Sequence, residues 1–398
     1  MQNKLLHTPE GVRDIYNDEC ERKQYILSKM RSIICSYGYR FIETPTFEFF
    51  DIFGKEVGTT PSKELYKFFD REGNTLVLRP DITPSVARAA AKYFPIETTP
   101  VRLCYEGNVF INNNSYQGRL KESSQLGVEF IGDNSVDADS EIIALVVKNL
   151  RAVGLEQFQI SIGHADLFRG LIKVAEFAEE EAEQLRTLII NKNFFGVDEF
   201  LLQHHLSQEL RQLFAMLGKM YDSPKEWQQL LPVAQKYPEI YHALCHLTHL
   251  YELLEVYDVA KYVSFELGLL SAYRYYTGIL FSGYTFGSGE PIVKGGRYDG
   301  LLSYFGKNAP AIGFALMTDQ LLIALERQKI DLPLQKDQEV VLFTPENRKI
   351  AVATAEELRD AGKIVSLVRM DLGTKSVSDY TEQYGTLKQI VLDGEYNG

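Results

Sequence analysis

The chain has 398 residues, of which 45% are apolar and 24% charged, and this composition is ordinary for two or three globular domains. Its 42 Lys and Arg against 54 Asp and Glu give a net charge of −12. That balance disfavours sequence-independent nucleic-acid binding, which depends on positive charge. The sequence shows no apolar run of membrane-spanning length and no signal-peptide pattern. Its four cysteines are too dispersed for a zinc knuckle or a disulfide framework. We therefore expect a soluble, cytoplasmic protein without a membrane segment.

The first third of the chain mixes helices with strands and lacks the regular alternation of a doubly wound fold. Apolar residues at helical spacing, a stop at Gly38 and a strand-ending Pro45 define the first two elements. Thr83 and Pro84 are typical of a helix start, with a capping hydroxyl and a proline at the first helical position. The predicted elements are a helix over 17–37, strands over 40–44 and 75–78, a helix over 83–93, and strands over 101–110 and 123–131.

The middle of the chain is mostly helical, and strands return after it. One strand interrupts the helices, and residues from about 165 to 260 are predicted as a helical insertion between two halves of a sheet. The remaining predicted strands of this part are 158–162, 263–267, 272–286 and 291–294, the last followed by a glycine turn and then a helix over 318–327. A charged, proline-bearing stretch, 329–337, indicates a linker. The resulting domains are a core over 1–328 and a small α/β module over 338–398, with strands over 340–343, 364–367 and 387–392 and a helix over 348–361.

Three histidines, His242, His246 and His249, would share one face of a helix. Zinc binding is one interpretation of this spacing, but no acidic residue nearby completes a ligand set. A polar helix face that carries histidines is the favoured interpretation. No metal ion and no cofactor are expected.

Five short strings occur in a fixed order along the chain: Thr8–Asp14, Leu78–Thr83, Gln125–Glu129, Tyr275–Gly278 and Gly295–Leu301. Each alone is weak, but together they resemble the catalytic core of histidyl-tRNA synthetase, a class II aminoacyl-tRNA synthetase, over roughly residues 7 to 327. The resemblance implies an α+β fold, with an antiparallel sheet and flanking helices, that normally forms a homodimer.

The same resemblance implies a pocket for histidine, which needs acceptors for an ammonium group and for an imidazole N–H. The resemblance implies that Asp81, which replaces a glutamate of the family, and Thr83 hold the ammonium group. It also implies that Gln125 and Glu129 contact the amino acid and that Tyr275 and Tyr276 lie beside the imidazole. Helix capping for the first pair and strand packing for the tyrosines remain open for each residue alone, whereas the ordered set favours the histidine pocket.

Activation of the amino acid by ATP requires more than this pocket. Its transition state is strongly anionic, and the synthetases stabilise it with three arginines. The matching positions in this chain are Ile111, Ser271 and Gln320. Arg274 is close in sequence, but as the neighbour of Tyr275 on a strand it should face the opposite way. At about 3 kcal/mol for each lost contact, we expect no synthetase activity and no catalytic residue.

A retained amino-acid pocket without the ATP chemistry resembles the synthetase paralogue that serves as the regulatory subunit of ATP phosphoribosyltransferase. This resemblance implies a protein that binds L-histidine for feedback regulation of histidine biosynthesis. It also implies assembly with a short-form catalytic subunit, as a hetero-oligomer and most plausibly a hetero-octamer, and self-association as a homodimer, without tRNA. The alternative is an active histidyl-tRNA synthetase or another synthetase-like enzyme, and the missing arginines argue against it.

Overall fold

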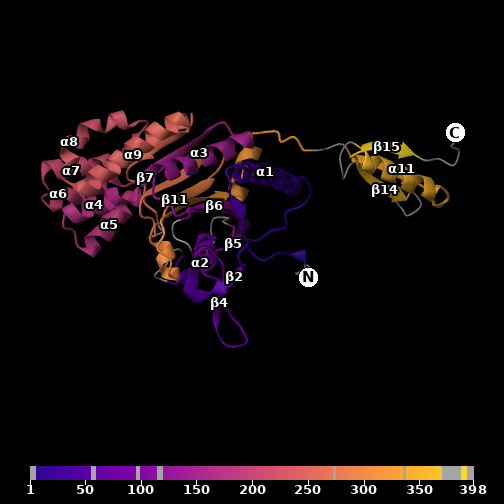
Figure 1. Cartoon of the computed structure of the whole chain (residues 1–398), viewed down its shortest axis with the longest axis horizontal. Helices are drawn as coiled ribbons and strands as arrows, with labels where there is room; N and C mark the ends of the chain where they lie inside the picture. Colours follow the sequence, from indigo (N-terminus) through magenta and orange to yellow (C-terminus); the bar gives the residue numbers. More distant parts are fainter. Residues whose placement is uncertain are drawn as a thin grey trace. The chain divides into compact units, whose positions relative to one another are not determined.

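The computed structural model describes residues 6–54, 60–95, 99–113, 120–271, 275–334, 338–369 and 387–391. The chain divides into two compact units, Met1–Leu332 and Pro333–Gly398, and Figure 1 draws both. The first unit contains the large sheet and the helical insertion, and the second is a small α/β unit. Among the described residues, no helix is long and apolar enough to cross a membrane.

A nine-stranded sheet forms the centre of the first unit, in the order β1-β5-β6-β12-β11-β10-β7-β9-β8. Neighbouring strands from β5 to β7 run antiparallel, while β1 pairs with β5 and β9 with β7 in parallel. Sequence-distant strands thus meet in the middle, where β6 pairs with β12. The strands are β1 (Arg40–Phe41), β5 (Val101–Phe110), β6 (Glu122–Ile131), β7 (Phe158–His164), β8 (Met220–Tyr221), β9 (Val263–Glu266), β10 (Ile279–Thr285), β11 (Val293–Arg297) and β12 (Ala311–Met317).

The two faces of this sheet bury different cores, as the period-2 pleat requires. On one face Leu126, Val128 and Phe130 of β6 pack with helices α1 (Asn17–Ser36) and α3 (Val136–Ala152). On the other, Leu103 and Tyr105 of β5 pack with helix α2 (Thr83–Tyr93). Figure 1 shows α1 and α3 on one side of the sheet and α2 on the other. The second face also carries the cavity described below.

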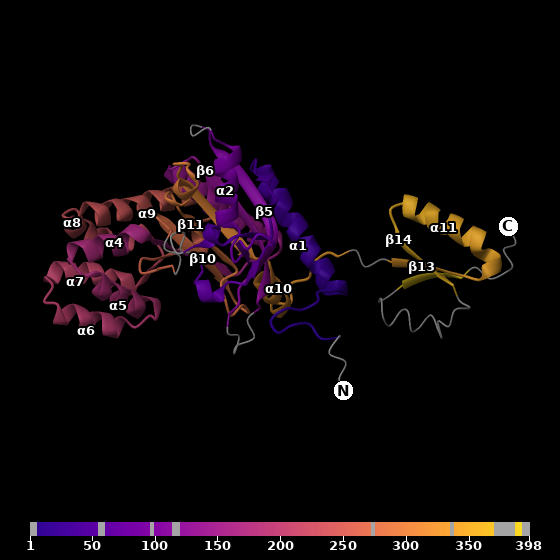
Figure 2. The same ribbon diagram turned by 90° about the horizontal axis from the view of Figure 1, so that it is seen from below.

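Helices inserted between β7 and β9 form one end of the first unit, as Figure 2 shows. They surround Trp227, which is fully buried with its ring against Tyr221 and Phe265, at centroid distances of 5.5 and 5.1 Å. The helices of the insertion are α4 (Ala165–Val174), α5 (Glu179–Ile190), α6 (Phe194–Gln203), α7 (Gln208–Ala215), α8 (Leu231–Ala234) and α9 (Pro238–Val256). Helix α10 (Thr318–Arg327) follows β12.

Two small sheets complete the fold. The first unit contains an antiparallel sheet in the order β2-β4-β3, made of β2 (Phe47–Phe49), β3 (Lys67–Phe69) and β4 (Thr75–Leu78). The second unit contains a parallel sheet in the order β14-β13-β15, with helix α11 packed on β13 and β14. Its elements are β13 (Gln338–Phe343), α11 (Arg348–Asp360), β14 (Ile364–Arg369) and β15 (Leu387–Val391).

The structure confirms most predicted elements and corrects others. Helices α1, α2, α10 and α11 and strands β4, β5 and β6 lie where the sequence pattern predicts them. The predicted strand over 272–286 is wrong at its start, because Tyr275 and Tyr276 precede β10 without strand structure, while residues 272–274 lie outside the described part. The strand predicted over 40–44 shortens to two residues.

The glycine turn predicted after Lys294 is also wrong. Gly295 and Gly296 lie inside β11, where a Cβ on Gly295 would overlap the ring of Phe281 on the neighbouring strand. These glycines therefore allow close packing within the sheet. Strand β12 was not predicted, because most of its residues are buried whichever face they occupy and it shows no alternation.

A buried ion pair links β11 to the helix layer. Arg297 is 4% exposed and donates from Nε and Nη2 to Oδ1 of Asp139 on α3, at 2.9 and 2.5 Å. His246 of α9 lies 2.8 Å from the other oxygen of Asp139. The histidine face of α9 thus contributes a hydrogen bond to this pair, and in the described part of the chain no group of three His, Cys, Asp or Glu side chains could hold a metal ion.

Replacing Arg297 by Met should destabilise the first unit by about 3–5 kcal/mol, because the carboxylate of Asp139 then stays buried without its main partner. Urea denaturation followed by tryptophan fluorescence measures this unit alone, since Trp227 is the chain's single tryptophan. The control is Lys236→Met, which removes an exposed pair with Glu209 and should cost less than about 1 kcal/mol. Equal midpoints for the parent and Arg297→Met would contradict the assigned importance of the pair.

Candidate functional site

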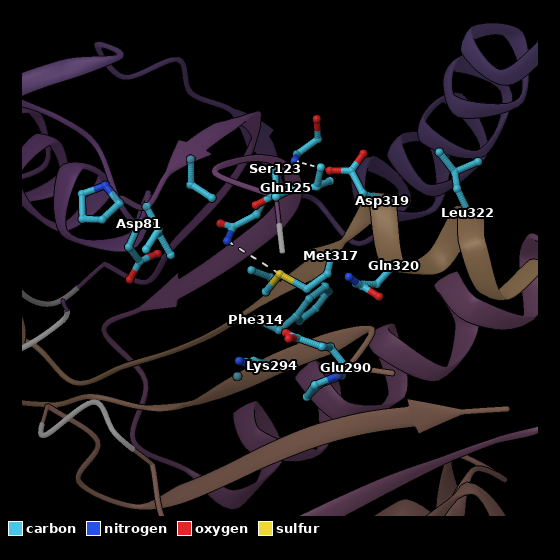
Figure 3. Close-up of a pocket in the computed structure, with 18 of the residues that line it drawn as sticks. Asp81, Ser123, Gln125, Glu290, Lys294, Phe314, Met317, Asp319, Gln320 and Leu322 are labelled. Atoms are coloured by element: carbon cyan, nitrogen blue, oxygen red, sulfur yellow. Dashed lines mark hydrogen bonds between the residues drawn. The ribbon is translucent and has the colours of Figure 1, made fainter. Parts of the chain in front are cut away.

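A cavity of about 1240 Å³ lies over β6, β12 and β11. Figure 3 draws residues that line it. Its floor consists of small residues, because Gly313 and Ala315 of β12 and Gly296 of β11 point to this face of the sheet. Register places Glu129 opposite Gly313 and Gln125 opposite Met317. Polar side chains of β6 therefore border a hollow floored by glycine and alanine.

Glu129 forms one end of this arrangement. Its carboxylate accepts a hydrogen bond from the Thr83 hydroxyl at 2.7 Å and another from the hydroxyl of Tyr298. A Cβ on Gly313 would overlap this carboxylate, so only glycine permits its position. Burial raises the pKa of Glu129 to about 8, although the two hydroxyl donors oppose the shift.

Asp81 and Gln125 provide further acceptors in the same cavity. Asp81 is 7% exposed, its carboxylate accepts the backbone N–H of Thr83 at 3.3 Å, and burial raises its pKa. Gln125 is 8% exposed; its amide nitrogen faces the sulfur of Met317 at 3.7 Å, while its Oε1 has no partner among the described residues. A buried, unpaired amide oxygen next to a cavity costs free energy unless a donor reaches it from a ligand or water.

The two predicted tyrosines cover β11. Their ring centroids lie 4.7 Å apart, and the Tyr275 ring meets that of Tyr298 edge-on at 5.9 Å. A Cβ on Gly296 would lie 2.7 Å from the ring of Tyr276. One cavity is therefore lined by all six residues predicted for the histidine pocket: Asp81, Thr83, Gln125, Glu129, Tyr275 and Tyr276.

One predicted detail is wrong. Thr83 was expected to cap the helix that follows, yet it is the first residue of α2, whose N-cap, Ile82, makes no side-chain capping bond. The Thr83 hydroxyl instead donates to Glu129. The Thr83 hydroxyl therefore positions the Glu129 carboxylate in the cavity and does not cap the helix.

Sequence reasoning missed two tyrosines near Glu129. Tyr298 belongs to the Gly295–Leu301 string, and counting alternate residues along β11 would have placed it on the cavity face. Tyr105 of β5 is fully buried over Gly127, and its hydroxyl has no hydrogen-bond partner in the described part of the chain. No sequence motif indicated Tyr105.

The outer part of the cavity is rich in carboxylates. Of the residues that the structure describes, eight acidic and four basic ones line the cavity. Asp319 already accepts the backbone N–H of Ser124 at 2.7 Å and the ammonium of Lys23 at 3.4 Å. Ile111 and Gln320 also line it. Such an environment attracts an ammonium group and disfavours a polyphosphate.

Comparison with known proteins places this fold in a class. A family model described as histidyl-tRNA synthetase matches residues 11–321. The structure of a histidyl-tRNA synthetase from Nostoc sp. PCC 7120 superposes with a TM-score of 0.79 at 21% identity, over 96% of this chain and 90% of that one. The first unit therefore has the fold of a histidyl-tRNA synthetase, a class II synthetase.

Closer relatives narrow the class. A protein from Acetivibrio thermocellus named ATP phosphoribosyltransferase regulatory subunit is 38% identical over 365 residues, which are 91% of this chain and 86% of that protein. A crystal structure of an ATP phosphoribosyltransferase regulatory subunit/histidyl-tRNA synthetase from Bacillus halodurans C has a TM-score of 0.85 at 32% identity, covering 98% and 99% of the two chains. The chain belongs to the family of ATP phosphoribosyltransferase regulatory subunits.

The raised pKa of Glu129 has a consequence for stability. The folded state holds this proton up to a pH of about 8, whereas the unfolded chain releases it near pH 4.5, so this group's contribution to stability falls as the pH rises between these values. Glu129→Gln should remove that loss, and its melting temperature relative to the parent should increase by a few degrees from pH 5 to pH 8.

Differential scanning calorimetry at both pH values measures this change. Glu180→Gln, at an exposed position of α5, is the matched control and should keep a constant difference from the parent. A constant difference for Glu129→Gln as well would show that the folded protein does not hold the proton.

Proposed function

We propose that the chain binds L-histidine in this cavity and, as a regulatory subunit, relays its presence to a catalytic ATP phosphoribosyltransferase subunit. The observation that carries the proposal is that the carboxylates of Asp81 and Glu129, which both accept a hydrogen bond from Thr83, line the same cavity as the unpaired Oε1 of Gln125. An ammonium group suits the acceptors of Asp81 and Gln125, and an imidazole N–H suits Glu129. The tyrosine rings of Tyr275 and Tyr276 supply flat apolar walls for the imidazole.

Adenylation is not part of the proposed function. By the resemblance to the synthetases, the positions of their three arginines correspond to Ile111, Ser271 and Gln320 in this chain. Of these, Gln320 accepts a hydrogen bond from Ser288, and the Ser271 carbonyl accepts one from Arg186. Without fixed guanidinium groups the anionic transition state loses its main stabilisation. The alternative, an active synthetase or a related enzyme, requires that chemistry.

The proposed partners are a short-form catalytic subunit, in a hetero-oligomer that we take to be an octamer, and a second copy of this chain; tRNA is not among them. Relatives named as regulatory subunits support the first partner. Exposed aromatic side chains support the second, because Phe47 and Phe49 of β2 and Phe69 of β3 are 52%, 56% and 72% exposed on one small sheet. The cytoplasm is the proposed compartment. We assign histidine binding to the core over 1–328 and no role to the linker, 329–337, or the module, 338–398.

Purified chain should bind L-histidine with a calorimetric stoichiometry of one per copy and show no histidine-dependent exchange between ATP and pyrophosphate. The pocket residues supply the binding, and the absent arginines remove the exchange. L-lysine and L-glutamine are the control ligands, since neither offers an imidazole to Glu129. Exchange at the rate of a normal synthetase would sink the regulatory proposal.

Within the complex, Asp81→Ala should move the midpoint of histidine inhibition to about ten- to a hundredfold higher concentration, because the ammonium loses a charged partner. Phosphoribosyltransferase activity without histidine should persist, since an effector acts only through its differential affinity for two states. The assay is a histidine titration of the reconstituted complex.

Asp198→Ala, at an exposed position of α6, is the control and should keep the parental midpoint. Light scattering of the same preparations reports the assembly, at 45.3 kDa for each copy of this chain. An unchanged inhibition midpoint in Asp81→Ala, with assembly intact, would mean that Asp81 does not contact the effector.

A further inference from the structure

A free amino acid carries a carboxylate as well as an ammonium group, and none of the six residues assigned above is a cation that could pair with it. Asp81 and Glu129 are acids, and Gln125 presents its free oxygen. A carboxylate bound beside Asp81 would lie in a partly buried site without a compensating cation among these six residues, which is destabilising. If histidine binds here, a cation or strong donor must compensate its negative end.

Lys294 of β11 is placed to provide this cation. It points to the cavity face of the strand, two residues before Gly296 and so about 6.6 Å along the strand from the floor beneath Tyr276. Register sets Lys294 opposite Ala315 of β12, which in turn lies opposite Gly127 of β6. Along the sheet, Lys294 therefore lies level with the point halfway between Gln125 and Glu129. Figure 3 draws Lys294 and Asp81 around the same pocket.

Among the described residues that line the cavity, no other basic side chain matches this position. Arg13 is paired with Glu19, and Arg327 of α10 donates to the carbonyl of Gly287 at 2.8 Å. Arg22 comes from α1, where Asp18 and Glu19 also line the cavity. Lys294 belongs to the floor strands themselves, is exposed to solvent, and makes no hydrogen bond or ion pair with any residue that the structure describes.

We propose that Lys294 binds the α-carboxylate of the amino-acid ligand and thereby makes the site select the free amino acid over its amide and its decarboxylated amine. The inference rests on the proposed histidine site and adds the residue that binds the carboxylate, the third polar group of the ligand after the ammonium and the imidazole. A lysine ammonium is a point charge on a flexible stem, which suits a carboxylate at the mouth of a cavity. The amide and the amine lack the carboxylate but retain the ammonium and the imidazole, so only their contact with Lys294 is lost.

Calorimetric titration with L-histidine, L-histidinamide and histamine tests this proposal on the full-length chain. The parent should bind L-histidine about ten- to a hundredfold more tightly than either analogue, the range expected for one charge-assisted contact. Lys294→Met should lose most of this preference by weakening L-histidine alone, and Lys294→Arg should restore it. Because the side chain is exposed, all variants should keep the parental melting temperature.

Lys225→Met, at an exposed position of the insertion, is the matched control and should behave as the parent. If the parent binds all three ligands equally, or if Lys294→Met keeps the preference for L-histidine, Lys294 does not read the carboxylate and only this inference fails. If the parent binds none of the three, the histidine site itself is wrong and the inference is overturned with it.

Discussion

The ion pair between Arg297 and Asp139 is the constraint on which the rest of the site depends. It holds the end of β11 against α3 on one face of the sheet. Consecutive residues of a strand point to opposite faces, so Tyr298 next to Arg297 turns toward the cavity and reaches Glu129. The same pleat sends Lys294 and Gly296 to the cavity face. One buried pair on the helix side thus sets the position of the cavity residues of this strand.

Burial of Glu129 is the second feature that shapes the site. Taking a carboxyl group out of water raises its pKa, and two hydroxyl donors recover only part of the cost. Gly313 makes the geometry possible, because any larger side chain would displace the carboxylate. A group held at such a cost is typical of a recognition site. The same low-dielectric surroundings would strengthen the hydrogen bond that we propose from a ligand N–H to Glu129.

The charges on the cavity wall separate binding from catalysis. Carboxylates outnumber basic residues, and one of them, Asp319, is already engaged with Ser124 and Lys23. A cationic amine gains from this field, whereas the phosphates of ATP do not. The cavity is also joined to the insertion, since His246 of α9 bonds to the same Asp139 that holds Arg297. Membership of the regulatory-subunit family agrees with a site made to bind.

The sequence by itself determined helices such as α1 and α2 and long strands such as β5, because the patterns that predict them are local. Through a family resemblance, its ordered strings also indicated six of the residues that line the cavity. Tertiary structure alone decided the place of β12, whose buried residues show no alternation, and the role of Gly295 and Gly313, whose close neighbours come from other strands. It also redirected Thr83 from a helix cap to Glu129. These outcomes depend on contacts between residues far apart in the chain, and local pattern carries no information about them.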